Sequence, residues 1–110
     1  NAVKLYFKKF KDQLTSDTFT GKIKNYNVIA TFANYAINEL AHYLIKKHKA
    51  DISVIVNTQA KTVSFRRSKS CDADVSILAQ KLCGGGGHAA AAGGKLTEQF
   101  ANLTKQFTPC

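Results

Sequence analysis

A glycine-rich run constrains the fold of this chain more than any other feature. Residues 84–94 read Gly-Gly-Gly-Gly-His-Ala-Ala-Ala-Ala-Gly-Gly and hold six of the seven glycines in the sequence. Each ordered glycine costs about 0.5–1 kcal/mol more than alanine in backbone entropy, so four in succession inside a domain need a compensating reason. A flexible linker is one explanation, because linkers are often glycine-rich. The four alanines that follow are not linker residues, which favours a segment where something approaches the backbone closely.

Amphipathic helices are predicted on both sides of this run. The first follows Asp74, a good N-cap, and ends at Gly84; the second precedes Pro109. Each has an apolar stripe at steps of three or four residues, formed by Val75, Leu78, Ala79 and Leu82 in the first and by Leu96, Phe100, Leu103 and Phe107 in the second. Both stripes need to pack in one core, which also argues against a linker between them.

The residues before position 74 predict further helices and strands. In chain order we expect a helix within residues 1–20 with the stripe Val3, Phe7, Phe10 and Leu14, a turn over 15–21, a strand over 23–32, a helix from Asn34 as N-cap to about Lys47, and strands over 52–56 and 62–67. This order predicts a single α/β (α+β) domain over residues 1–110, with a small mixed β-sheet flanked by helices.

The charge balance is a weak hint about partners. The 110 residues include 16 Lys+Arg and 7 Asp+Glu, which gives a formal charge of +9. Such an excess suits a phosphate-bearing partner, but lysines on solvent-exposed faces produce the same excess. Charge alone therefore does not identify a ligand.

The sequence shows no sign of export or membrane insertion. No stretch approaches the ~20 apolar residues of a membrane span, and no leader-like segment is recognisable. Cys71, Cys83 and Cys110 form no C-x-x-C pair, which argues against a disulfide framework or a zinc ribbon. We expect reduced thiols, a cytoplasmic location and no membrane partner. Because the chain starts at Asn1 and contains no methionine, we interpret it as part of a longer protein.

The glycine-rich run is also a candidate anion-binding segment. Backbone N–H groups of Gly85, Gly86 and Gly87 can form a concave donor surface for phosphate oxygens, because no Cβ obstructs them. The imidazole of His88 can donate to the same phosphate or to a base edge. A helical start at 89–92 would add the attraction of a helix dipole.

A neighbouring strand supplies further candidates. The alternation over 62–67 places Val63 and Phe65 on one face and Ser64 and Arg66 on the other. A guanidinium binds phosphate with two parallel hydrogen bonds, which lysine does not. A surface role for Arg66, with its stem packed on the sheet, is an equally good interpretation of the pattern alone.

The remaining polar candidates have structural explanations. Asp72 and Asp74 precede a predicted helix, where capping is a far commoner role than metal binding. Cys83 stands where an apolar residue would end that helix, so it is interpreted as a small buried hydrophobe. His42 and His48 lie on a lysine-rich helix without carboxylate neighbours and are expected in solvent.

Three segments together resemble the DHH-associated domain, the C-terminal part of DHH-family phosphoesterases. They are Val63–Arg66 (Val-Ser-Phe-Arg), the capped helix over 72–82, and Gly84–Gly93 (Gly-Gly-Gly-Gly-His-x-x-Ala-Ala-Gly). The resemblance extends from about Val28 to Gly94. This family includes RecJ-type exonucleases, oligoribonucleases that degrade nanoRNA, and phosphodiesterases of linear or cyclic dinucleotides.

The resemblance implies a substrate-binding domain of a two-domain hydrolase. A separate N-terminal DHH domain would carry the two-manganese centre, so we expect no catalytic residue, metal or cofactor in this fragment and no activity from it alone. The expected ligand is a short oligonucleotide, a dinucleotide or single-stranded nucleic acid. By resemblance its phosphate and terminal nucleotide are held by Ser64, Arg66, Gly85, Gly86, Gly87 and His88. Three departures put substrate preference in doubt: Arg67 stands where serine is frequent, and Ala89 and Ala90 replace larger side chains.

Two alternatives stay open. The first is a non-catalytic module that binds RNA or single-stranded DNA, as does the related C-terminal domain of alanyl-tRNA synthetases. The second is a dimerisation domain, in which case the partner is a second copy of the chain.

Overall fold

The computed structural model describes residues 18–109, so the helix predicted within residues 1–20 lies almost wholly outside the described residues. The elements in chain order are β1 (Phe19–Ile23), β2 (Tyr26–Phe32), α2 (Ile37–His48), β3 (Ile52–Asn57), β4 (Thr62–Arg67), α3 (Val75–Cys83), β5 (Gly86–Gly87), β6 (Ala91–Lys95), α4 (Glu98–Thr104) and β7 (Thr108–Pro109).

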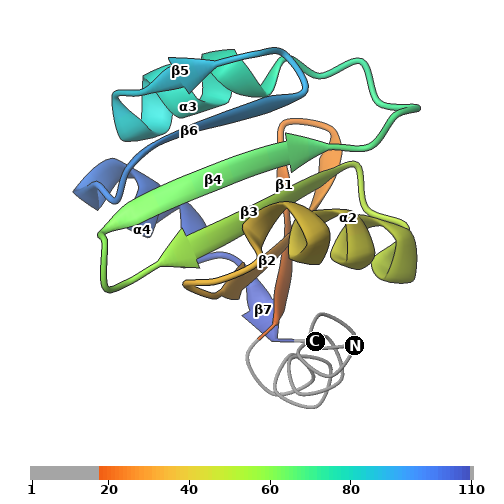
Figure 1. Ribbon diagram of the computed structural model, residues 1–110, viewed down its shortest axis with the longest axis horizontal. Helices are drawn as coiled ribbons and strands as arrows, with labels where there is room; N and C mark the ends of the chain where they lie inside the picture. The colour runs from red at the N-terminus through yellow and green to blue at the C-terminus, as the bar shows by residue number, and fades with distance from the viewer. Residues whose placement is uncertain (1–17, 110) are drawn as a thin grey trace.

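The strands form one mixed sheet in the order β5-β6-β4-β3-β2-β1-β7 (Figure 1). Strands β2 and β3 are parallel, and α2 is the crossover that such a pair requires. The other strand pairs are antiparallel. This arrangement confirms the predicted α+β class and the mixed sheet flanked by helices.

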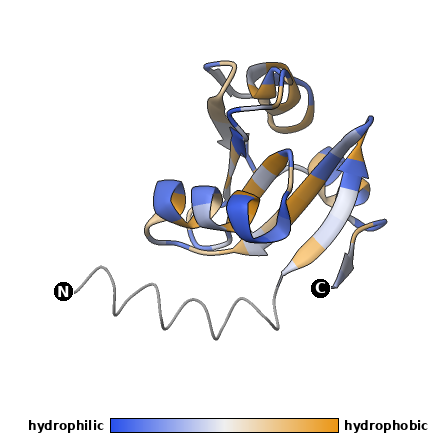
Figure 2. Ribbon diagram, turned by 90° about the vertical axis from the view of Figure 1, so that its right-hand side faces the viewer, coloured by the Kyte–Doolittle hydropathy of each residue, from blue (hydrophilic) through white to orange (hydrophobic). Residues whose placement is uncertain are grey.

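The helices cover opposite faces of the sheet. On one face, Leu40, Ala41 and Leu44 of α2 pack against Ile29 and Ile55. On the other face, α3 and α4 enclose the larger core cluster. The ribbon coloured by hydropathy shows mostly hydrophobic central strands and a more hydrophilic α2 (Figure 2).

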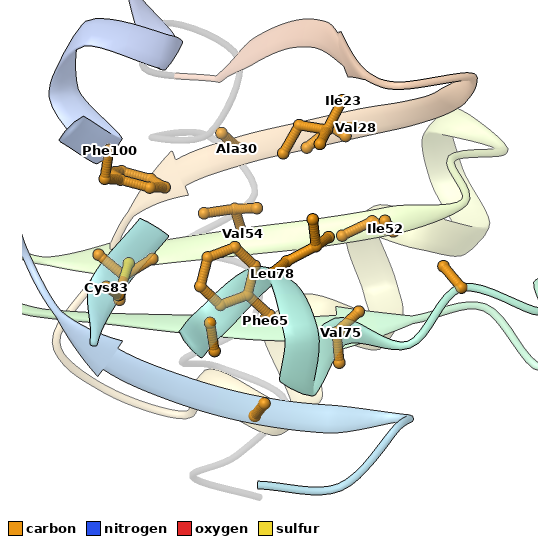
Figure 3. Packing of buried hydrophobic residues seen from close by; sticks show 14 of the residues in the cluster. Ile23, Val28, Ala30, Ile52, Val54, Phe65, Val75, Leu78, Cys83 and Phe100 are labelled. Carbon is orange, nitrogen blue, oxygen red and sulfur yellow. The ribbon is translucent and has the colours of Figure 1, made fainter. Parts of the chain in front are cut away.

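Phe65 lies in the middle of the larger core. Its ring meets that of Phe100 edge-to-face at 6.1 Å between centroids, and Figure 3 shows it among Val54, Leu78 and Cys83. Val63 and Phe65 are fully buried on this face, whereas Ser64 and Arg66 are partly exposed on the α2 face. The predicted alternation along this strand is therefore confirmed, and it directs Ser64 and Arg66 away from the core.

The first strand was predicted wrongly. The segment expected as one strand over 23–32 contains a hairpin: Ile23 pairs with Tyr26, and β1 extends back through residues expected in a turn. Lys24 adopts a left-handed φ of 56° at the reversal. Thr18 and Ile23 are buried although their neighbours are polar and turn-forming, so tertiary packing overrides local propensity here.

The predicted cap of α2 is also wrong. Ala36, with a left-handed φ of 53°, occupies the N-cap position and makes no side-chain cap bond. The Asn34 amide instead donates to Gln59 Oε1 at 2.9 Å. By contrast, Asp74 caps α3 as predicted, since its side chain accepts from the Ser76 N–H at 3.0 Å.

The last helix is shorter than its apolar stripe suggests. Thr97 caps α4 by accepting from the Phe100 N–H at 3.1 Å. Leu96 therefore precedes the helix, where its N–H donates to the Lys61 carbonyl. Phe107 follows the helix, and Thr108 then pairs with Thr20 of β1.

Candidate functional site

The glycine-rich run folds as a hairpin and not as a loop or a helical start. Strands β5 and β6 pair Gly86 with Gly93 and Gly87 with Ala92. His88 and Ala91 exchange backbone hydrogen bonds of 2.8 and 3.2 Å, so Ala89 and Ala90 form a tight turn. The expected helix dipole at residues 89–92 is therefore absent, because these residues belong to the turn and to β6.

Two glycines in this hairpin permit close approach of backbones. A Cβ on Gly85 would lie 2.0 Å from the Gly93 carbonyl oxygen, and one on Gly94 would lie 2.6 Å from the Cys83 carbonyl oxygen. Gly87 has a φ of 148°, which disfavours any other residue. Glycine at these positions lets β6 and the end of α3 pack together.

The predicted surface of three free glycine amides is only partly present. The Gly85 N–H donates to the Ala79 carbonyl at 3.1 Å and so helps to end α3. The alternation of an antiparallel ladder, set by the exchange between His88 and Ala91, turns the Gly86 N–H toward β6 and the Gly87 N–H toward the open edge. Gly85 therefore positions the hairpin and does not offer its amide to a ligand.

Among residues 18–109, α2 covers only part of its face of the sheet. Helix α2 packs over β2, β3 and β4, whereas β5 and β6 lie beyond it. The strand register aligns Gly86, Gly93 and Ser64 in one row across three strands. A Cβ on Gly86 would meet nothing within 4 Å, so no packing within the described residues requires glycine there. Gly86 is exposed and Gly93 and Ser64 are half-buried, so another molecule can approach the backbone along this row, which we call the floor.

A second row carries the charged side chains. Arg66 lies opposite Ala91 on β6, and Ala91 lies opposite His88. With neighbouring strands about 4.8 Å apart, the backbones of His88 and Arg66 are roughly 10 Å apart, with the small Ala91 between them. His88 is exposed. The hairpin thus brings together Ser64, Arg66 and His88, which sequence reasoning had selected from two separate segments.

The Arg66 guanidinium is held by neutral groups. Its Nε donates to Asn38 Oδ1 at 2.8 Å, and its Nη1 donates to the carbonyl oxygens of Phe65 at 2.8 Å and Ala92 at 3.3 Å. Partial burial lowers the pKa of the guanidinium, and no carboxylate of the described residues is paired with it. A partly desolvated cation without a counter-charge favours an anionic ligand.

Asn38 is not among the site residues predicted from the sequence. It lies 28 positions before Arg66, in the first turn of α2, and only the crossover connection brings the two together. Polar residues beside an apolar helical stripe are common, so the sequence pattern gives no sign that Asn38 bonds to Arg66.

Arg67 has a structural role. Its Nη1 donates to the Ala73 carbonyl at 2.7 Å, which ties the segment before α3 to the end of β4. Its backbone N–H donates to Ala90, and the Val75 N–H at the start of α3 donates to Ala89. The hairpin turn is therefore anchored through its carbonyl groups, which leaves the His88 side chain outside these contacts.

Other candidate residues also have structural partners. The Tyr26 hydroxyl donates to Asp72 Oδ1 at 3.2 Å, and this hydrogen bond raises the pKa of Tyr26. Cys83 is buried, as predicted, and burial raises the pKa of its thiol to about 11. Residues 18–109 contain no cluster of three His, Cys, Asp or Glu side chains suited to a metal. Within the same range, no helix is long and apolar enough to cross a membrane.

The sequence matches the model of a known family over most of the described residues. A model of the DHHA1 domain matches residues 22–109. The chain belongs to the DHHA1 family. The match covers every described strand and helix from the end of β1 onward, including the Ser64–Arg66 segment and the hairpin.

Solved structures contain the same fold within longer chains. An uncharacterized protein from Helicobacter pylori G27 matches this DHHA1 domain with a TM-score of 0.64 and 22% identity, over 79% of this chain and 27% of that one. The pGpG-specific phosphodiesterase PggH from Vibrio cholerae matches with a TM-score of 0.57 and 21% identity, over 94% of this chain and 39% of that one. No curated protein matches the chain.

Proposed function

We propose that this DHHA1 domain binds the phosphate and terminal nucleotide of short oligonucleotides or dinucleotides, for hydrolysis by a separate DHH domain that holds two manganese ions. The observation that carries the proposal is the Arg66 guanidinium, which is partly buried, has neutral partners and lies beside an open floor of small residues. In this proposal the domain supplies the groups that bind the substrate, and the separate DHH domain supplies the metal ions.

Each site residue has a distinct role in this proposal. Arg66 pairs with a phosphate through Nη2, the part of its guanidinium that has no hydrogen bond to residues 18–109. His88, roughly 10 Å away across Ala91, contacts the same phosphate or the terminal nucleotide. Gly86 and Ser64 provide a flat surface, and the Gly87 N–H at the sheet edge is an additional donor.

A dinucleotide is the ligand that these dimensions favour. The floor spans the three strands β4, β6 and β5, and it ends at the turn formed by His88–Ala91. A ligand with one or two phosphates fits such a surface, whereas a long strand needs a longer basic path. The specificity of PggH for pGpG, in a chain that contains the same fold, supports this choice of probe.

The proposal is tested by titrating the 110-residue chain with pGpG and with a long single-stranded RNA at two salt concentrations. We expect pGpG to shift the backbone amide NMR signals of Arg66, Gly86, Gly87 and His88. Arg66→Gln should weaken pGpG binding at least tenfold, whereas Lys95→Gln, an exposed charge at the end of β6, should not. Steeply salt-dependent binding of the long strand only would contradict the proposal and favour a general nucleic-acid-binding module.

A further inference from the structure

The contact between Asn38 and Arg66 links helix α2 to strand β4 beside the floor. Asn38 lies in the first turn of α2, and its Oδ1 accepts from Arg66 Nε at 2.8 Å. The Nη1 of Arg66 donates to two carbonyl oxygens of β4 and β6. These bonds fix the plane of the guanidinium from two directions. They leave Nη2 as the part of the group without a bond to the described residues.

The choice of partner is unusual for a guanidinium. Arginine side chains that are partly buried are commonly paired with carboxylates, because an opposite charge offsets the loss of hydration. A carboxylate is present one position along α2, at Glu39, yet the hydrogen bond is made by the neutral amide of Asn38. An aspartate at position 38 would have the same shape and could accept the same hydrogen bond.

The difference between the two side chains is their charge. An aspartate would form an ion pair with Arg66 and compete with any anionic ligand. An amide fixes the same geometry and leaves the positive charge uncompensated. The cost is lower stability of the unliganded domain, since a partly desolvated cation has no counter-charge among residues 18–109.

We propose that Asn38 is a positioning residue, which holds Arg66 in a fixed orientation without neutralising it and so keeps the guanidinium available to a phosphate. This inference rests on the proposed function and assigns the site a residue from α2. A purely structural tie between α2 and β4 would need only the hydrogen bond, and an aspartate would serve it as well or better.

The substitution Asn38→Asp separates these two roles because it changes stability and binding in opposite directions. We expect Asn38→Asp to raise the Tm by several degrees, since it pairs with Arg66, and to weaken pGpG binding at least tenfold. Asn38→Leu, which removes the acceptor, should lower both the Tm and the affinity. Glu39→Gln is the matched control for a change of one charge in the same helical turn, and it should leave affinity within twofold.

A double-mutant cycle removes the contribution of the helix dipole. An aspartate near the start of a helix is stabilising by itself, so Asn38→Asp is also measured in the Arg66→Gln background. The part of the Tm gain that comes from the ion pair should disappear there. A Tm gain of the same size in both backgrounds overturns the inference, as does unchanged or tighter pGpG binding by Asn38→Asp.

The cycle also distinguishes the two proposals from one another. If the parent chain binds pGpG but Asn38→Asp binds it equally well, the role of Asn38 is refuted and the proposed function stands. If the parent chain does not bind pGpG at all, the proposed function fails and this inference fails with it.

Discussion

Gly85 and Gly93 lie in such close contact that a Cβ on Gly85 would come within 2.0 Å of the Gly93 carbonyl oxygen. The Gly85→Ala substitution must therefore separate the end of α3 from β6. We expect it to destabilise the domain by about 2–4 kcal/mol, as overpacking against rigid backbone does. Chemical denaturation of the 110-residue chain measures the change. A loss below about 0.5 kcal/mol would show that the hairpin can shift without cost.

Gly86→Ala should leave stability unchanged but weaken ligand binding. Its Cβ would meet nothing within 4 Å, so the free energy of unfolding should stay within about 0.5 kcal/mol of the parent. A methyl group on the open floor should nevertheless weaken pGpG binding, and Gly86→Val should weaken it further. Calorimetric titration of both variants checks this, with Gly85→Ala as the comparison for stability. Affinity unchanged in Gly86→Val would remove Gly86 from the site.

His88→Ala should reduce binding without changing stability. The backbone of His88 closes the turn through its bonds with Ala91, and alanine retains both bonds. The imidazole is exposed and forms no side-chain hydrogen bond with residues 18–109, so the Tm should stay within about 2 °C. The affinity for pGpG should fall about tenfold, the loss expected for one charge-assisted hydrogen bond. A large fall in Tm with unchanged affinity would assign His88 to the fold instead.

Ionisation of the buried Cys83 thiol should lower the free energy of unfolding at alkaline pH. Burial raises the pKa of this thiol from 9.0 to about 11, so the folded state holds its proton where the unfolded state has lost it. The stabilising contribution of the protonated thiol is complete below pH 9 and is lost as the pH rises through 11. Cys83→Ala should therefore flatten the decline in unfolding free energy between pH 9 and 11. Parallel curves for parent and variant would contradict this.

The central elements could be predicted because their burial follows regular periods. Strand β4 buries alternate residues, helices α2 and α3 bury residues at helical spacing, and β3 is an almost continuous buried apolar run. Asp74 caps α3 through a local contact. The position of Ser64 and Arg66 on one face follows from the same alternation. The burial patterns, the cap and the shared face are all set by residues close together in the sequence, so they could be predicted.

The errors occur where distant contacts decide the structure. The turn at Lys24 is recognisable only once β1 is seen to pair with β2 and β7. The glycine-rich run becomes a hairpin because the end of α3 and β6 approach closely, which no local propensity encodes. Asn38 likewise joins Arg66 only through the crossover of α2.

The order of the strands has a mechanical consequence. The described chain begins in β1 and ends in β7, which pair at one edge of the sheet, whereas β5 with the His88 turn forms the opposite edge (Figure 1). Five strand spacings separate β1 from β5, which is roughly 24 Å. A rotation of roughly 10° about the β1–β7 edge would therefore carry the His88 turn through roughly 4 Å. In such a rotation the residues of β1 and β7 would move least and the His88 turn would move most, because the two lie at opposite edges of the sheet.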